Sequence, residues 1–171
     1  MANSSLHRSH RTFVSYIDRT REFYLAQGYE SPYQWAYFDE VPFTRLSGAL
    51  SECRLTLITT ASPFREECTS EGGLPMPKEV SSGATDAPPE RLYTADLAWD
   101  KETTHTDDLD SFFPIHRLQE LVDAGQIGSL AARFHGVPTE YSQRRTMEQD
   151  APEVLHRCRE DEVDAALLVP L

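Results

Sequence analysis

The feature that most constrains the fold is a short apolar run that follows a charged stretch near the end of the chain. The segment Val163–Leu171 reads Val-Asp-Ala-Ala-Leu-Leu-Val-Pro-Leu and comes directly after the charged residues of Arg157–Glu162. A run of this length is typical of a fully buried central strand in a parallel sheet. In open α/β sheets the site lies just beyond the carboxyl end of such a strand, so we expect a loop and another helix to follow Leu171. The sequence therefore predicts an α/β protein that is truncated after a central strand.

The rest of the chain alternates between predicted helices and strands. Apolar spacing predicts helices over Thr12–Gln27, Pro114–Gly125, Tyr141–Gln149 and Pro152–Arg159, with Asp150 as a cap, and strands over Arg54–Thr60 and Arg91–Trp99. Residues 1–10 are expected to be disordered, and residues from about 65 to 90, rich in Gly, Pro, Ser and Glu, are expected to form a long flexible loop. We therefore predict a single α/β domain over residues 11–171, with a mainly parallel sheet flanked by helices.

Charge and hydropathy limit the partners and the location. The chain has 171 residues and a formal net charge of −12, which argues against nucleic-acid backbones and anionic membrane surfaces as partners. No stretch approaches the ~20 apolar residues of a membrane span. The N-terminal Met1–Arg8 lacks the apolar core of a secretory signal, so we expect a cytoplasmic protein.

The cysteines and the glycines give no sign of a resident cofactor. Cys53, Cys68 and Cys158 are widely spaced and form neither a zinc pattern nor a C-x-x-C pair, which indicates free thiols. Cys68 lies in a polar stretch with three neighbouring glutamates, which disfavour the thiolate and make it a poor nucleophile. Dinucleotide, phosphate-loop and nucleophile-elbow motifs are all missing from the sequence, so no cofactor is evident.

The densest group of polar residues is the acidic segment Asp100–Asp110. It follows the second predicted strand and is expected at the carboxyl edge of the sheet. One His and several carboxylates offer a site for a hard divalent metal or a general base. The alternative is an acidic loop that caps the helix starting at Pro114, because a negative charge near a helix N-terminus stabilises it by ~0.3–1 kcal/mol.

Three further residues are candidates for binding or proton transfer. Ser62 lies in the turn after the first strand, which is expected over the carboxyl edge, and is assigned to substrate binding. Arg133 offers a planar fork that can clamp a substrate carboxylate, and His135 can titrate near neutrality. A surface arginine and an exposed loop histidine are the alternative interpretations of these two.

Several stretches together carry a resemblance to a known family. They are Val41–Thr44 with Leu50–Glu52, Phe112–Leu118 with Gly125–Leu130, and the terminal Glu160–Leu171. Their order and spacing over Trp35–Leu171, with a gap in the middle, resemble the short bacterial members of the glycine/sarcosine/betaine/D-proline reductase selenoprotein B family. In that family the matching final strand runs into a turn that contains Cys or selenocysteine. Because selenocysteine is encoded by a codon otherwise read as stop, the resemblance places the redox residue directly after Leu171.

The resemblance implies an oxidoreductase subunit that takes part in reductive cleavage. In the better-known relatives a selenolate or thiolate attacks carbon and displaces an amine, which a pyruvoyl group on another subunit activates, and a dithiol then reduces the product. Short members carry a His/Asp-rich stretch ahead of the Phe-Pro helix, which points to His105, Asp107 and Asp110 as catalytic residues. We expect a small-molecule substrate, a partner subunit or homo-oligomer, and an isolated chain that is inactive. The alternative is a non-catalytic or metal-binding α/β module that interacts through the aromatic Tyr29–Tyr37 arm and the acidic loop.

Overall fold

The computed structural model describes residues 15–31, 36–41, 43–62, 79–93, 106–139 and 142–170. The chain divides into two compact units, Met1–Pro42 and Phe43–Leu171, each of which is described by itself. The predicted disorder of residues 1–10 lies outside the described residues, as do the greater part of the loop predicted around residues 65–90 and most of the strand predicted over Arg91–Trp99.

The described residues of the N-terminal unit form one helix, α1 (Tyr16–Ala26), as the apolar spacing predicted. Ser15 caps it by accepting a hydrogen bond from the backbone N–H of Asp18 at 3.2 Å. Gly28, with φ of 86°, follows the helix in the left-handed region that glycine adopts without strain.

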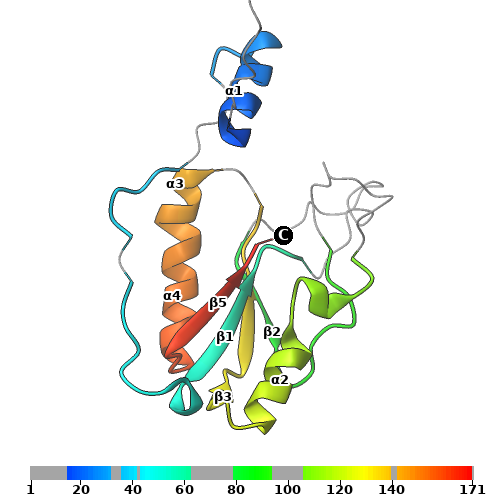
Figure 1. Cartoon of the computed structure of the whole chain (residues 1–171), viewed down its shortest axis with the longest axis vertical. Helices are drawn as coiled ribbons and strands as arrows, with labels where there is room; N and C mark the ends of the chain where they lie inside the picture. Colours follow the sequence, from blue (N-terminus) through cyan, green and yellow to red (C-terminus); the bar gives the residue numbers. More distant parts are fainter. Residues whose placement is uncertain are drawn as a thin grey trace, which may run out of the picture. The chain divides into compact units, whose positions relative to one another are not determined.

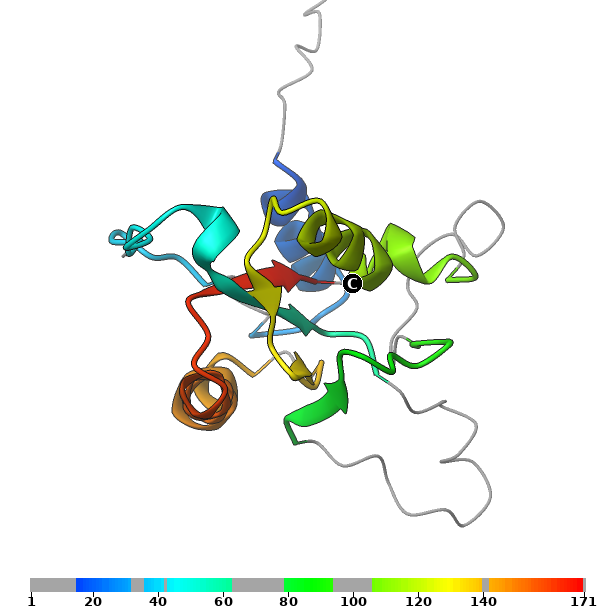
Figure 2. The same cartoon turned by 90° about the horizontal axis from the view of Figure 1, so that it is seen from below.

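The described residues of the second unit form a mixed five-stranded sheet with helices on both faces. Its strands are β1 (Arg54–Thr59), β2 (Ser81–Ala84), β3 (Ser129–Leu130), β4 (Arg133–Gly136) and β5 (Ala165–Val169). Along one side, β1 pairs in parallel first with β3 and then with β4, and along its other side it pairs in parallel with β5. β2 pairs with β4 in the antiparallel direction. Figure 2 shows α2 (Ile115–Asp123) on one face of the sheet and α4 (Ala151–Glu160) on the other. The general α/β class is therefore confirmed.

The main core lies between the sheet and α2. Ile115 and Leu118 of α2 and Leu57 of β1 are almost fully buried, and they pack with Phe113 and Phe134. The rings of Phe113 and Phe134 meet edge to face with their centroids 4.8 Å apart. The helix ends before Gly125, where φ is 69°, as the sequence predicted for this boundary.

The region before α4 differs from the predicted break at Pro152. The short α3 (Gln143–Arg145), a π-helical turn η4 (Thr146–Asp150) and α4 follow one another without interruption. Asp150 has helical φ and ψ of −69° and −47° and makes no side-chain cap hydrogen bond, so its predicted capping role is wrong. Pro152, which cannot donate a backbone hydrogen bond, is the second residue of α4 and directly follows the π-helical turn.

Two predictions about strands need correction. β2 lies within the stretch predicted to be a flexible loop. β5 was predicted to be a fully buried central strand, but among the described residues it pairs only with β1, and the Leu168 side chain is 67 % exposed. The apolar run was read as a strand covered on both faces and paired on both edges, whereas the described residues provide one neighbouring strand.

No helix in the described part of the chain is long and apolar enough to cross a bilayer.

Candidate functional site

The carboxyl edge of the parallel strands is where the structure brings several chain segments together (Figure 1). Thr59 of β1 lies opposite Gly136 of β4 on one side and Val169 of β5 on the other. The segments that leave this edge therefore start side by side. In open α/β sheets this edge is the usual place for a binding site.

Ser62 lies at this edge, as the sequence predicted. It is three residues beyond the end of β1, and its backbone N–H and carbonyl exchange two 2.7 Å hydrogen bonds with Tyr93. The Thr59 hydroxyl accepts the Ala61 N–H at 3.0 Å and tightens the turn between the strand and Ser62. These bonds hold the backbone at Ser62 in place, while its substrate-binding role stays a prediction.

Asp110 acts as a cap for α2. Its Oδ1 accepts the backbone N–H of His116 at 3.0 Å, and its Oδ2 lies 2.9 Å from Nδ1 of the same histidine. The Nε of Arg117 is 4.0 Å from Oδ2, and Asp108 in turn accepts the Asp110 N–H at 3.1 Å. This geometry is the capping arrangement that the sequence left open as the alternative to a catalytic role.

The predicted His105–Asp107–Asp110 set is only partly described. His105 lies outside the described residues, and Asp107 is exposed in the bend that leads to the 3-10 helix η3 (Leu109–Ser111). Among the described residues, no three His, Cys, Asp or Glu side chains are placed so that they could hold a metal ion. The sequence did not predict the contact of His116 with Asp110, and the available signal was the position of His116 one residue into the helix that follows an acidic loop.

Arg133 lies at the opposite edge of the sheet from Ser62. It begins β4, at the amino end of the parallel strands. Its Nε and Nη2 each donate a 2.9 Å hydrogen bond to Asp161, and Nη2 also donates to Glu160 at 3.2 Å. The hydrogen bond from Arg133 holds the pKa of Asp161 below its usual range. The bonds to Asp161 and Glu160 in turn raise the pKa of Arg133. The guanidinium fork that was assigned to a substrate carboxylate is thus engaged by carboxylates of the chain itself.

His135 is a buried strand residue and not an exposed loop histidine. Its side chain is fully buried in β4, and Nδ1 lies 2.9 Å from the Ser82 hydroxyl. Nε2 has no hydrogen-bond partner among the described residues. Burial, followed by the charge of Arg133, lowers the pKa of His135, so its neutral form is favoured.

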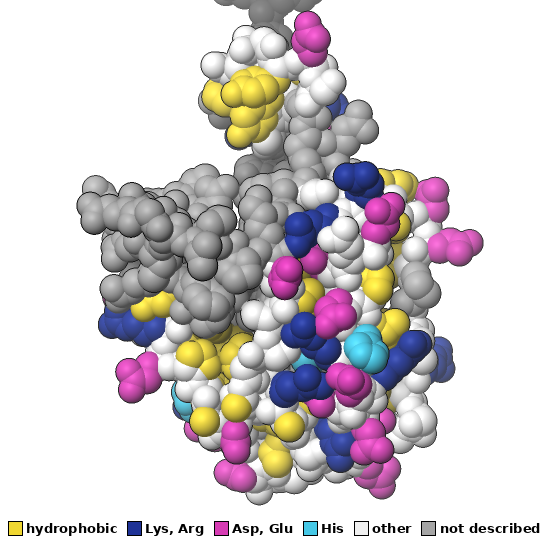
Figure 3. Space-filling view, turned by 180° about the vertical axis from the view of Figure 1, so that it is seen from behind, with side chains coloured by type: hydrophobic (Ala, Val, Ile, Leu, Met, Phe, Trp, Pro, Cys, Tyr) yellow, Lys and Arg dark blue, Asp and Glu magenta, His cyan; other side chains and the backbone are white. Residues whose placement is uncertain are grey.

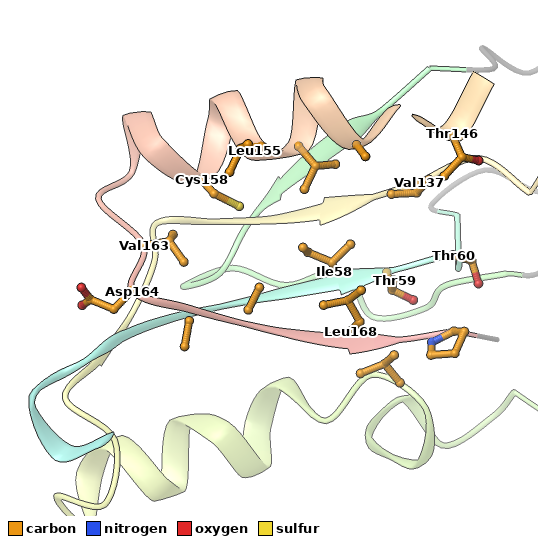
Figure 4. Close-up of a pocket in the computed structure, with 16 residues that line it drawn as sticks. Ile58, Thr59, Thr60, Val137, Thr146, Leu155, Cys158, Val163, Asp164 and Leu168 are labelled. Carbon is orange, nitrogen blue, oxygen red and sulfur yellow. The ribbon is translucent and has the colours of Figure 1, made fainter. Parts of the chain in front are cut away.

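The structure also contains an apolar groove on the α4 face of the sheet (Figure 4). It has a volume of about 530 Å³ and lies between α4 and the strands β1 and β5. Leu155 and Cys158 point down from α4, while Ile58 and Leu168 line it from the two strands. Threonines mark its end at the carboxyl edge, and Asp164 marks the other end. Burial raises the pKa of the Cys158 thiol, which leaves it protonated and unreactive at neutral pH.

The outer surface of this unit is charged rather than apolar on the side seen in Figure 3, where acidic and basic side chains are interleaved. Two such pairs lie along α4, Arg157 with Glu153 at 2.7 Å and His156 with Glu160 at 3.4 Å. The groove beside β5, by contrast, is lined mostly by apolar side chains.

Comparison with models of protein families, with curated proteins and with solved structures finds no match for this chain.

Proposed function

We propose that the chain is the scaffold portion of an oxidoreductase subunit resembling selenoprotein B of the amino-acid reductases, with the redox Cys or selenocysteine placed just after β5. The observation that carries this proposal is the register of β5. Val169 lies opposite Thr59 at the carboxyl edge of the parallel strands. A residue that follows β5 would lie beside the turn of Ser62, at the edge where α/β enzymes gather their reacting groups.

The chemistry proposed for this edge needs a nucleophile that the described residues do not provide. Cys53 is buried before β1, at the amino end of the strand, and Cys158 faces the groove in its protonated form. In the proposed reaction a thiolate or selenolate attacks the substrate carbon and displaces an amine, and a dithiol supplies the electrons that restore the nucleophile. We therefore propose that the 171-residue chain is inactive by itself. Its small-molecule substrate and its cytoplasmic location are parts of the same proposal.

The exposed final strand counts against the interrupted-reductase interpretation, which predicted this strand at the buried centre of the sheet. It favours the second candidate, an α/β module that acts through interaction. In the described residues β5 presents an unpaired edge, and Leu168 is largely exposed beside the groove. Exposed apolar strips with a free strand edge are typical of surfaces that bind another polypeptide.

The codon that follows Leu171 separates the two candidates. An in-frame TGA with further coding sequence supports the reductase, and selenium labelling of the native organism should then give a labelled product longer than this chain. A different stop codon, or TGA followed by noncoding sequence, would contradict the reductase and leave the interaction module.

A further inference from the structure

His135 lies at the centre of the sheet on the face that α4 covers. In β4 it is paired with Ile58 of β1 on one side and with Ser82 of β2 on the other. Its neighbour Phe134 packs into the core with α2, so the alternation of side chains along a strand turns His135 toward α4 (Figure 2). The residue is 0 % exposed. Backbone pairing holds both neighbouring strands, so α4 is the cover that can leave the ring without breaking the sheet.

The hydroxyl of Ser82 joins the imidazole to the helix. Nδ1 of His135 lies 2.9 Å from Oγ of Ser82, and Nη1 of Arg157 in α4 donates to the same oxygen at 2.8 Å. A guanidinium can only donate, so the hydroxyl accepts from the helix and can give its own proton to the ring. Nε2 has no hydrogen-bond partner among the described residues. This arrangement suits an imidazole that is neutral and accepts at Nδ1.

The charges around the ring are mainly positive. Arg133 lies two residues before it on β4, Arg157 lies above it on α4, and the residues opposite it in β1 and β2 carry no charge. Asp161, just after α4, favours the charged ring but is bound by Arg133, and Glu153 of α4 is bound by Arg157 at 2.7 Å. Burial and then the charge of Arg133 lower the pKa of His135. Both the packing and the charges therefore oppose protonation while α4 is in place.

We propose that His135 makes the contact between α4 and the sheet an acid-sensitive switch, in which protonation of this ring releases the helix. The imidazolium would have no acceptor for its Nε2–H, and it would share the single oxygen of Ser82 with a second cation. Lifting α4 admits water to the ring and separates the two cations. The ion pairs of Arg133 hold the C-terminal end of the helix, and they persist because the pKa of Asp161 is lowered. The N-terminal part of α4 therefore opens and uncovers Val154, which is buried in the closed state.

This switch does not rest on the reductase proposal, because it concerns a helix contact and not the residue after Leu171. The experiment is hydrogen exchange of the backbone amides at pH 7.5 and pH 5.5, corrected for the intrinsic exchange rates. In the open state His135 regains the usual pKa of about 6.5, so the opening of α4 should become more favourable by up to about tenfold between these pH values. Low urea should leave this exchange unchanged, since a local opening exposes little surface. Exchange of α4 with the same free energy and urea dependence as β1 would show that the helix is lost only in global unfolding, and would overturn the switch.

Three variants assign the response to the ring and its contact. His135→Gln cannot be protonated in this range and should remove the pH response of α4. The matched control is His156→Gln in the same helix, where the side chain is 66 % exposed, and it should keep the response. Ser82→Ala, at an exposed position, tests the contact even if the first variant folds poorly, and it should speed the exchange of α4 already at pH 7.5. A response that survives in folded His135→Gln or is lost in His156→Gln, unchanged exchange in Ser82→Ala, or equal exchange of α4 at both pH values in the unchanged chain would each contradict the proposal.

Discussion

Replacing Arg133 by Met tests whether this residue stabilises the fold or binds a substrate. In the structure its guanidinium joins the start of β4 to the end of α4 through three hydrogen bonds with Asp161 and Glu160. Methionine keeps most of the aliphatic stem and removes the charge. The Asp161 side chain, 14 % exposed, is then left without its bidentate partner.

The expected loss of stability follows from the exposed fractions of the two side chains. Leaving a buried charged group unpaired costs about 1–3 kcal/mol or more, and the upper part of that range applies to full burial. Arg133 is 36 % exposed, so water screens part of the interaction. We expect the free energy of unfolding to fall by about 1–2 kcal/mol, or the melting temperature by roughly 5 °C. Asp161→Asn should couple strongly to this change in a double-mutant cycle.

The pH dependence gives a second readout. Because Arg133 lowers the pKa of Asp161 in the folded state, the pair contributes stability above the usual pKa of an aspartate. That stability is lost as the pH falls through the lower folded value. Urea unfolding between pH 7 and pH 3 should therefore show a smaller loss for Arg133→Met than for the unchanged chain. Equal acid dependence in both proteins, or no loss of stability at pH 7, would refute the structural role.

Three further changes test the core, the buried histidine and the cap. Phe113→Ala should lower the free energy of unfolding, measured in urea, by about 3–5 kcal/mol, because the ring is fully buried against Phe134. The control Phe43→Ala, at a side chain that is 88 % exposed, should change it by less than about 0.5 kcal/mol. The pKa of His135 is lowered in the folded state. The free energy of unfolding should therefore fall as the pH drops below the usual pKa of histidine, and it should level off below the pKa of the folded state. His135→Gln should remove this fall, and an unchanged dependence of stability on pH would argue against the buried neutral imidazole. Asp110→Ala should lower stability by about 1 kcal/mol through loss of the α2 cap. A stable variant that loses the activity of a longer, active form would instead favour the catalytic assignment of Asp110.

The sequence by itself determined the elements whose signals are local. The β-branched run predicted β1 over Arg54–Thr60, and the structure has it over Arg54–Thr59. Proline at the start and glycine at the end predicted α2 almost to the residue, since both act on the backbone of their own turn. The apolar run near the end correctly indicated β5. The placement of Ser62 followed from the general rule that parallel strands end at one edge.

Only the tertiary structure decided the features that depend on distant partners. β2 and β4 are short, and β2 contains Gly83, so local propensity does not reveal them. They form because β2 pairs with β4 and β4 pairs with β1. The ring of buried His135 is hydrogen-bonded to Ser82, 53 residues away, and Arg133 is engaged by Asp161, 28 residues away. The burial of β5 was overestimated for the same reason. An apolar composition tells which side chains avoid water, but the number of neighbouring strands is set by contacts that no local pattern encodes.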